Sequence, residues 1–173
     1  DDSINGRSIN YPRGKTLGGS SSINGLLYIR GQSQDYDIWQ QQGNTGWGWD
    51  DVLPYFIKSE DQERGKDKYH GVNGPLSVSN IRIKLDILDE FRNAAEEKGI
   101  PKIKDFNTGD NFGCDYFQVT EKNGLRCSTA VGYLNPVKKR SNLQIEVKAH
   151  VKQINFDGKK AIGISYWKNN KLI

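Results

Sequence analysis

The sequence has 173 residues, of which 35% are hydrophobic, and a formal net charge of +4 at pH 7; this length fits one ordinary domain or a piece of a larger one. Its mean hydropathy of −0.76 is low for a chain that must bury its own core, so we expect a fragment or a domain that relies on a partner. The aromatic content (four Trp, eight Tyr, six Phe) argues against disorder, and lysines mixed with carboxylates, without a basic stripe, argue against nucleic-acid binding.

The sequence offers little for metal binding, disulfides or membrane insertion. Cys114 and Cys127 match neither a CxxC nor a zinc spacing, so we expect reduced thiols. His70 and His150 have no His or Cys at ligand spacing, which predicts no metal site. No apolar run approaches the roughly 20 residues that a bilayer span needs, and the first residues, "DDSING", are acidic where a secretory signal is basic. We therefore expect a cytoplasmic protein.

The first half of the chain predicts short helices joined by loops. After the glycine-serine run "GKTLGGSSSING", the apolar residues of "SINGLLYIRG" predict a short buried helix over 22–31. "DYDIWQQQG" predicts a helix that ends at Gly43. "WDDVLPYFIKSE" predicts another, with Asp50 as its N-cap and Pro54 near its first turn. Residues 64–74 are charged and contain glycine, which indicates an exposed loop.

The second half combines one clear helix with strands. "PLSVS" alternates as a strand does, and "LDILDEFRNAAEEKG" predicts a helix with one apolar face and Gly99 at its C-terminus. "DFNTGDNFG" indicates a loop, "DYFQVT" a strand, and "STAVGYL" a short helix capped by Ser128 or Thr129. "LQIEVKAHVKQINF" and "AIGISYW" predict two strands joined by a turn at "DGKK". The elements do not alternate as a doubly wound sheet would, so the predicted fold class is α+β.

The glycine-serine run could be a linker, a tight turn or a ligand-binding loop. A P-loop is excluded because Ile9 stands where Walker A needs its first glycine, and the glycine offsets do not fit G-x-G-x-x-G. A linker would rarely contain Leu17 and pass straight into an apolar segment. Glycines that allow close backbone approach, followed by serine hydroxyls, favour an anion or cofactor cradle.

The longer stretch "PRGKTLGGSSSINGLLYIRGQSQDYDIW" resembles the first signature of the glucose-methanol-choline (GMC) flavoprotein oxidoreductases, in particular their choline and alcohol dehydrogenase branch. "GWGWDDVLPYFIKSED", "YHGVNGPLSVS" and "GLRCSTAVGYLNPVKK" are similar to later segments in the family's order. The resemblance covers essentially all of the chain. It implies an internal portion of an FAD-dependent oxidoreductase that acts on CH–OH groups by hydride transfer to flavin N5.

The resemblance also implies which residues bind FAD. The glycine turn would lie near the pyrophosphate, Asn24 near the isoalloxazine, and the Val151 main chain near the adenine. An ordinary tight turn, and a core valine, are the alternatives for these positions. Because Ile23 stands where some relatives carry a flavin-linked histidine, we expect non-covalent FAD. The predicted cofactor-binding residues are Gly14, Thr16, Gly18, Gly19, Ser20, Asn24, Gly25, Leu26, Leu27 and Val151.

The resemblance divides the chain into three regions. Residues 1–62 would hold the FAD-embracing glycine loop and lid helices, 63–126 a substrate-side region with one amphipathic helix, and 127–173 a short helix and strands of the FAD-binding domain. In the family, the βαβ unit with the dinucleotide fingerprint lies upstream of Asp1, and the catalytic histidine lies downstream of this segment. The sequence therefore predicts no catalytic residue here, and a segment that is inactive alone and binds FAD weakly or not at all.

Several other residues have structural explanations that we prefer. A buried Arg30 pairing with Asp35 or Asp37, and tryptophans that fill the core (Trp39, Trp47 and Trp49), need no catalytic role. His70 could titrate near neutral pH, but its "HG" matches a loop of the substrate-side region, so we expect a structural role.

The expected partners are an alcohol substrate of the parent enzyme and the remaining N- and C-terminal parts of that enzyme. Two alternatives have no catalytic role: a stand-alone binding or assembly module, and a homo-oligomer that pairs open strand edges at 143–167.

Overall fold

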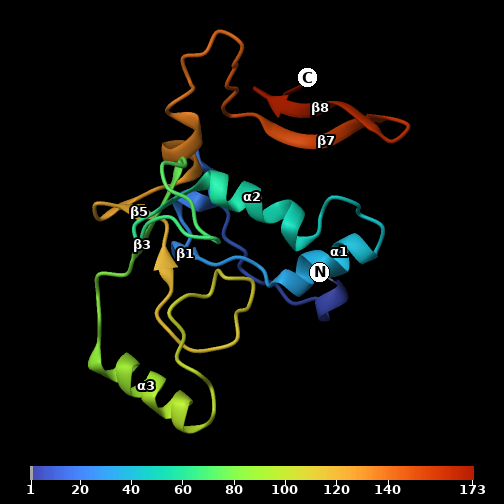
Figure 1. The fold of residues 1–173 in the computed structure, drawn as a ribbon. Helices are drawn as coiled ribbons and strands as arrows, with labels where there is room; N and C mark the ends of the chain where they lie inside the picture. Colours follow the sequence, from blue (N-terminus) through green and yellow to red (C-terminus); the bar gives the residue numbers. More distant parts are fainter. Residues whose placement is uncertain (1) are drawn as a thin grey trace. The chain divides into compact units, whose positions relative to one another are not determined.

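The computed structural model describes residues 2–173, and their contacts divide the chain into two units, Asp1–Pro136 and Val137–Ile173 (Figure 1). The first unit contains the helices α1 (Ser33–Gln41), α2 (Trp49–Ser59) and α3 (Asp86–Glu97), the 3-10 turns η1 (Asp2–Ile4) and η2 (Gly19–Ser22), and the π-helix η3 (Ala130–Leu134). The mixture confirms the α+β class. The three functional regions assigned from the sequence remain a prediction.

A small mixed sheet organises the first unit, with the strand order β1-β4-β3-β2. Its strands are β1 (Leu27–Tyr28), β2 (Glu60–Gln62), β3 (Leu76–Asn80) and β4 (Gln118–Val119). β1 and β3 both pair antiparallel with β4, whereas β2 pairs parallel with β3. A separate hairpin, β5 (Glu121–Lys122) and β6 (Leu125–Arg126), turns through Asn123 and Gly124, which both have positive φ as a tight hairpin turn requires.

The core of the first unit is small and unusually polar. Val78 and Val119 are 1% and 6% exposed, and only a few other apolar side chains are buried. The buried polar side chains are Arg30, Glu60, Gln62, His70, Ser77, Ser79, Asn107, Gln118 and Ser128. This interior agrees with the low mean hydropathy of the sequence, because much of what it buries is charged or polar.

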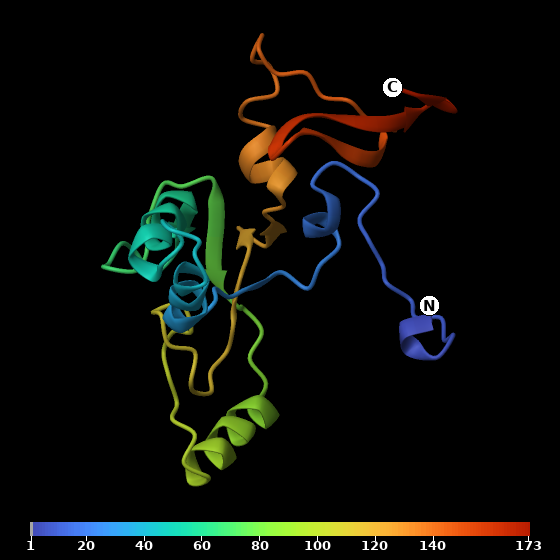
Figure 2. The same cartoon turned by 90° about the vertical axis from the view of Figure 1, so that its right-hand side faces the viewer.

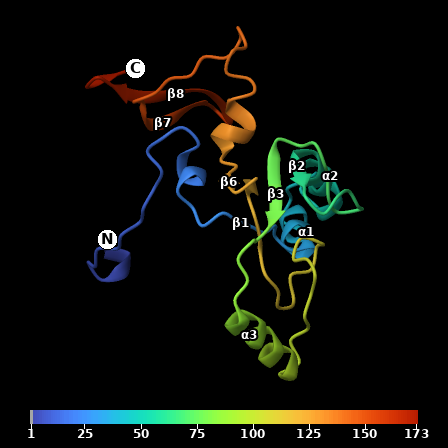
Figure 3. The same cartoon turned by 90° about the vertical axis from the view of Figure 1, so that its left-hand side faces the viewer.

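Helices α1 and α2 form as predicted and pack through aromatic side chains. The N-cap of α2 is Gly48, not Asp50; the Asp51 carboxylate accepts a hydrogen bond from Gly48 N at 3.1 Å, and Pro54 lies inside the helix. The Tyr36 ring lies between Trp49 and Phe56, at 5.8 Å from each ring centre. Trp39 and Trp47 are 45% and 53% exposed, so the expectation that they fill the core is wrong. Figure 3 shows β2 and β3 beside α2.

Helix α3 forms where its apolar period predicts it, and Gly99 follows it with a φ of +85°. Its apolar face is nevertheless uncovered, with Leu88 42% and Phe91 67% exposed. Figure 2 shows α3 set apart from the sheet of the first unit, at the end of two connecting segments. Arg92 fastens the helix to the following loop by an ion pair of 2.8 Å with Asp115.

The predicted buried helix over 22–31 does not form. The chain instead makes the short turn η2 and then strand β1. Leu26 has a φ of +68°, which an α-helix cannot contain, and its carbonyl accepts a hydrogen bond from Thr120 N at 2.8 Å in the sheet. Ile23 and Leu27 are 52% and 56% exposed, so the apolar run is not a buried stripe.

The second unit is a three-stranded antiparallel sheet, β7 (His150–Asp157), β8 (Lys160–Lys168) and β9 (Lys171–Leu172). The turn at Gly158 confirms the predicted hairpin, but residues 143–149, expected in the first strand, lie outside it. Register pairs Ile154 with Ile164 on one face, while Asn155 and Ser165 hydrogen-bond on the other. Between the register shifts at Val151/Gln153 and Asn155/Phe156, the sheet therefore has one apolar and one polar face. Across residues 2–173, no helix combines the length and apolarity that a membrane span requires.

Candidate functional site

The glycine loop, residues 14–25, folds back on itself. A Cβ at Gly14 would lie 2.0 Å from the Gly19 carbonyl oxygen, so only glycine at position 14 lets the two backbone segments of the loop approach this closely. Gly14 N donates to Ser20 Oγ at 3.3 Å, and Gly19 N donates to the Thr16 carbonyl at 2.9 Å. The predicted residues Gly14, Thr16 and Ser20 thus build the loop itself.

One side of the glycine loop packs against the segment that leads into η3. A Cβ at Gly18, whose φ is +90°, would lie 3.2 Å from both Ser128 Oγ and Ala130 Cβ. Ser21 Oγ accepts a hydrogen bond from Thr129 N at 2.9 Å and donates to the Gly18 carbonyl at 2.5 Å. Protein atoms therefore fill the side of Gly18 on which a Cβ would lie.

The other side of the glycine loop is open. A Cβ at Gly19 or Gly25 would meet nothing within 4 Å. Among the residues that the structure describes, no protein acceptor binds the backbone N–H groups of Gly18, Ser20 or Gly25. Free N–H donors beside glycines with open space form a surface on which an anionic or carbonyl-rich ligand can lie against the main chain.

Arg126 fastens the end of the glycine loop. Its Nη1 donates to Asn24 Oδ1 at 2.6 Å and to the Ser21 carbonyl at 3.1 Å, and its Nη2 donates to the Asn24 carbonyl at 2.9 Å. Arg126 is not among the residues predicted from the sequence to bind the cofactor. Its place in the "GLRCST" segment was visible, but nothing in the sequence shows that β6 returns to the loop.

The remaining predicted cofactor residues are divided between the two units. Leu26 and Leu27 lead the loop into β1, where Leu27 pairs with Val119. Val151 lies in β7 of the second unit, paired with Tyr166 and 51% exposed. Its role, like the others, stays a prediction.

A buried ionic cluster is the second notable feature of the first unit, and it corrects the predicted partner of Arg30. The Arg30 guanidinium pairs with Glu60 at 2.9 Å, not with Asp35 or Asp37. Those two carboxylates accept hydrogen bonds from backbone N–H groups at the starts of α1 and α2. Arg30 also lies over the Phe56 ring, 5.1 Å from its centre.

His70 completes this ionic cluster. Its Nδ1 lies 3.0 Å from Glu60 Oε2, and its Nε2 lies 3.3 Å from Asp105 Oδ2. Burial opposes the charged imidazole, but the carboxylates of Asp105 and Glu60 outweigh it and raise the pKa of His70 to about 9. His70 is 2% exposed and protonated at neutral pH, as a structural residue. The neighbouring Tyr28, whose hydroxyl accepts from Arg30 Nε, has its pKa raised by burial to about 12.

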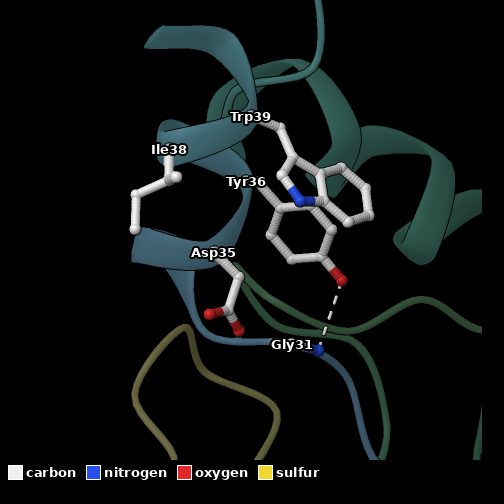
Figure 4. A pocket seen from close by; sticks show the side chains of 5 residues that line it. All are labelled: Gly31, Asp35, Tyr36, Ile38 and Trp39. Carbon is white, nitrogen blue, oxygen red and sulfur yellow. Dashed lines mark hydrogen bonds between the residues drawn. The ribbon is translucent and has the colours of Figure 1, made fainter. Parts of the chain in front are cut away.

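An open pocket of about 420 Å³ lies along α1 and is lined by Gly31, Asp35, Tyr36, Ile38 and Trp39 (Figure 4). None of the predicted site residues lines it. Its polar groups already serve the local fold: Tyr36 OH accepts from Gly31 N at 3.2 Å, and Asp35 Oδ2 accepts from Gln32 N at 2.8 Å. The glycine loop therefore remains the better candidate for ligand binding.

Comparison with curated proteins gives matches along almost the whole chain. The chain is 42% identical over 168 residues to "Alcohol dehydrogenase [acceptor]" of Pseudomonas putida, which covers 96% of this chain and 30% of that protein. It is 38% identical over 168 residues to "Choline dehydrogenase, mitochondrial" of Homo sapiens, covering 97% of this chain and 28% of that protein. The chain thus spans about 30% of the length of the curated relatives.

Solved structures and a family profile agree with these matches. Pyridoxine 4-oxidase from Mesorbium loti superposes with a TM-score of 0.85 at 28% identity, over 98% of this chain and 34% of that one. An FAD-dependent oxidoreductase from Chaetomium thermophilum gives a TM-score of 0.85 at 30% identity, over 98% and 32%. The profile described as GMC oxidoreductase matches residues 2–173. The expected family is therefore confirmed, and the chain belongs to the GMC oxidoreductases.

Proposed function

We propose that this chain forms part of the FAD site of an enzyme that oxidises CH–OH groups, of the alcohol or choline dehydrogenase type. The observation that carries the proposal is the two-sided glycine loop. Gly14 and Gly18 are packed against protein, whereas Gly19 and Gly25 have open space and stand among free N–H groups. The φ of +54° favours glycine at position 19 in any tight turn, whereas Gly25 has neither a positive φ nor a protein atom that a Cβ would meet, so its main chain is open to a ligand.

The residues present fit a dinucleotide. The N–H groups of Gly18 and Ser20 can donate to anionic oxygens, and no Cβ keeps such a ligand away from Gly19. Arg126, next to the loop, has no carboxylate within ion-pair distance among residues 2–173, so its positive charge favours an anionic ligand there. Ile23 offers no nucleophile for a covalent link, which supports non-covalent binding.

A bound flavin supplies the hydride acceptor for oxidation of an alcohol. The alcohol proton must go to a base, and the described residues of this chain do not offer a suitable one. His70 is buried, and its two carboxylate partners raise its pKa so that it already carries a proton at neutral pH. The chain's own contribution is therefore to bind and orient the cofactor, and the base comes from elsewhere in the enzyme.

It follows that the isolated 173-residue chain does not oxidise alcohols and binds FAD weakly or not at all. Flavin fluorescence and alcohol-dependent dye reduction, measured on the purified chain, check both statements. Dye reduction with bound flavin in the isolated chain would contradict the division of roles proposed here.

A segment exchange tests the proposal directly. The matching 168 residues of the Pseudomonas putida alcohol dehydrogenase are replaced by this chain, and the purified exchange protein is compared with the parent for bound flavin and alcohol oxidation. We expect flavin at the parent's level and measurable alcohol oxidation. A folded exchange protein without flavin would contradict the proposal.

A smaller exchange serves as a control for folding. It transfers only residues 14–29. The host enzyme therefore keeps its own core and its own residue at the position of Arg126. If the larger exchange does not fold, the smaller one still has to retain flavin, because it carries every glycine and serine of the proposed loop surface together with Asn24.

The exposed faces of the second unit favour one alternative, an oligomer that forms through the β7–β8–β9 sheet. Ile154 and Ile164 are 54% and 50% exposed on its apolar face, and β7 and β9 are open edges. Sedimentation at micromolar concentration distinguishes the two functions. A mass above 19.6 kDa that an Ile154→Lys substitution returns to the monomer value would support the oligomer.

A further inference from the structure

The Asn24 side chain is held in a single orientation. Its Oδ1 accepts a hydrogen bond from Arg126 Nη1 at 2.6 Å and another from Leu26 N at 3.2 Å. A guanidinium and a backbone N–H can only donate, so both partners require the oxygen, and not the nitrogen, to face them. The amide orientation is therefore fixed twice, by two independent donors.

The consequence is that Asn24 presents only a donor outward. Its Nδ2 amide has no acceptor among the described residues, and the residue as a whole is exposed. An asparagine free to rotate could offer either an acceptor or a donor to a ligand. In this loop Asn24 Oδ1 already accepts two hydrogen bonds, so a ligand meets only the two N–H donors of Asn24 Nδ2.

Arg126 suits this task better than a lysine would. Three of its hydrogen bonds reach three different oxygens, the Ser21 carbonyl, the Asn24 carbonyl and Asn24 Oδ1. The rigid, planar guanidinium can satisfy such a divergent set at once, whereas an ammonium group is a point charge on a flexible stem. The main chain and the side chain of Asn24 are thus fixed by the same residue.

We propose that Arg126 is a positioning residue of the glycine loop, which takes the Asn24 oxygen so that the Asn24 Nδ2 amide is presented as a hydrogen-bond donor to an acceptor atom of the bound flavin. The proposal rests on the proposed function for the identity of the ligand. The part that concerns Arg126 and Asn24 is a property of the chain itself and can be tested without FAD.

The first test measures backbone amide hydrogen exchange in the isolated chain. Arg126→Lys should speed exchange at the Asn24 and Leu26 amides by about tenfold, since one net hydrogen bond to a charged group contributes about 1.5 kcal/mol. The Thr120 amide, bonded to Leu26 O in the sheet, should change little. Arg82→Lys is the matched control, because Arg82 is an exposed arginine paired with Glu63.

The second test uses the exchange protein and measures its dissociation constant for FAD. Arg126→Lys should weaken FAD binding about tenfold and Arg82→Lys should leave it unchanged. Asn24→Asp keeps an oxygen for Arg126 but removes the Nδ2 donor, so it should leave loop exchange slow and still weaken FAD binding about tenfold. Titration at about 0.5 M salt, where the Debye length is only about 4 Å, reduces the effect of the added charge.

The outcomes separate the two proposals. Unchanged Asn24 and Leu26 exchange in Arg126→Lys, or wild-type FAD affinity in Asn24→Asp, overturns the positioning role. An exchange protein that carries the unaltered segment and holds no flavin overturns the proposed function, while the hydrogen-exchange test of Arg126 remains decisive for the contact.

Discussion

The Arg30 guanidinium and the Glu60 carboxylate form an ion pair of 2.9 Å whose side chains are 1% and 0% exposed. Arg30 lies just after β1, and Glu60 opens β2, at the far side of the four-stranded sheet. The pair thus links the segment that follows one outer strand to the start of the other outer strand, inside the protein. A buried pair of this kind is costly to break, since removing one partner leaves the other charge uncompensated.

Glu60→Gln should therefore destabilise the chain by about 3–5 kcal/mol, because Arg30 loses its carboxylate partner and His70 keeps only Asp105. Urea denaturation followed by circular dichroism measures the change. Glu63→Gln is the matched control: Glu63 pairs with Arg82 at the surface, so its loss should cost less than about 1 kcal/mol. Equal losses of unfolding free energy in the two variants would show that the buried Arg30–Glu60 pair stabilises the fold no more than a surface pair does.

The pKa of His70, raised from 6.5 to about 9, predicts how stability depends on pH. Because the folded-state pKa is the higher one, the contribution of His70 is complete below about pH 6.5, declines as pH rises, and is lost above about pH 9. The shift corresponds to about 3 kcal/mol. Unfolding free energies measured between pH 6 and 10 should fall accordingly.

His70→Gln removes this contribution and should flatten the decline between pH 6.5 and 9. His150→Gln is the control, since His150 is exposed in the second unit and lacks a carboxylate partner among the described residues. A decline that persists unchanged in His70→Gln would assign the pH dependence to other groups.

The exposed face of α3 predicts a contrast between two apolar truncations. Phe91 is 67% exposed and Val78 is 1% exposed. Phe91→Ala should change the unfolding free energy by less than about 0.5 kcal/mol, whereas Val78→Ala should lower it by about 1.5–3 kcal/mol. A large loss in Phe91→Ala, measured by thermal or urea denaturation, would mean that the face of α3 is covered in solution.

Local patterns in the sequence predicted the elements that depend on neighbouring residues. The period of residues 85–97 gave α3, the "DGKK" turn gave the β7–β8 hairpin, and the long glycine-containing signature gave the family. Contacts between distant residues were not predictable in this way. Arg30 contacts Glu60, and Asn24 contacts Arg126, only because the four-stranded sheet and the β5–β6 hairpin bring together segments that are far apart in the chain.

The same reason explains the errors at the candidate site. The apolar residues after the glycine loop suit a helix by their spacing, but pairing of Leu27 with Val119 in the sheet decides the local structure. The glycines themselves could be recognised, while their division into packed and open positions could not. At Gly18 that division depends in part on Ser128 and Ala130, which lie more than a hundred residues further along the chain.

The central claim, that the open side of the glycine loop contacts FAD, is tested most directly by Gly25→Ala in the exchange protein. A Cβ at Gly25 meets no protein atom within 4 Å, so the fold should tolerate it, and Gly163→Ala in β8 is a control with the same open surroundings. Bound flavin per chain, measured by absorbance, should fall in Gly25→Ala and stay at the unaltered level in Gly163→Ala. Equal flavin content in the two variants, with equal melting temperatures, would contradict the claim.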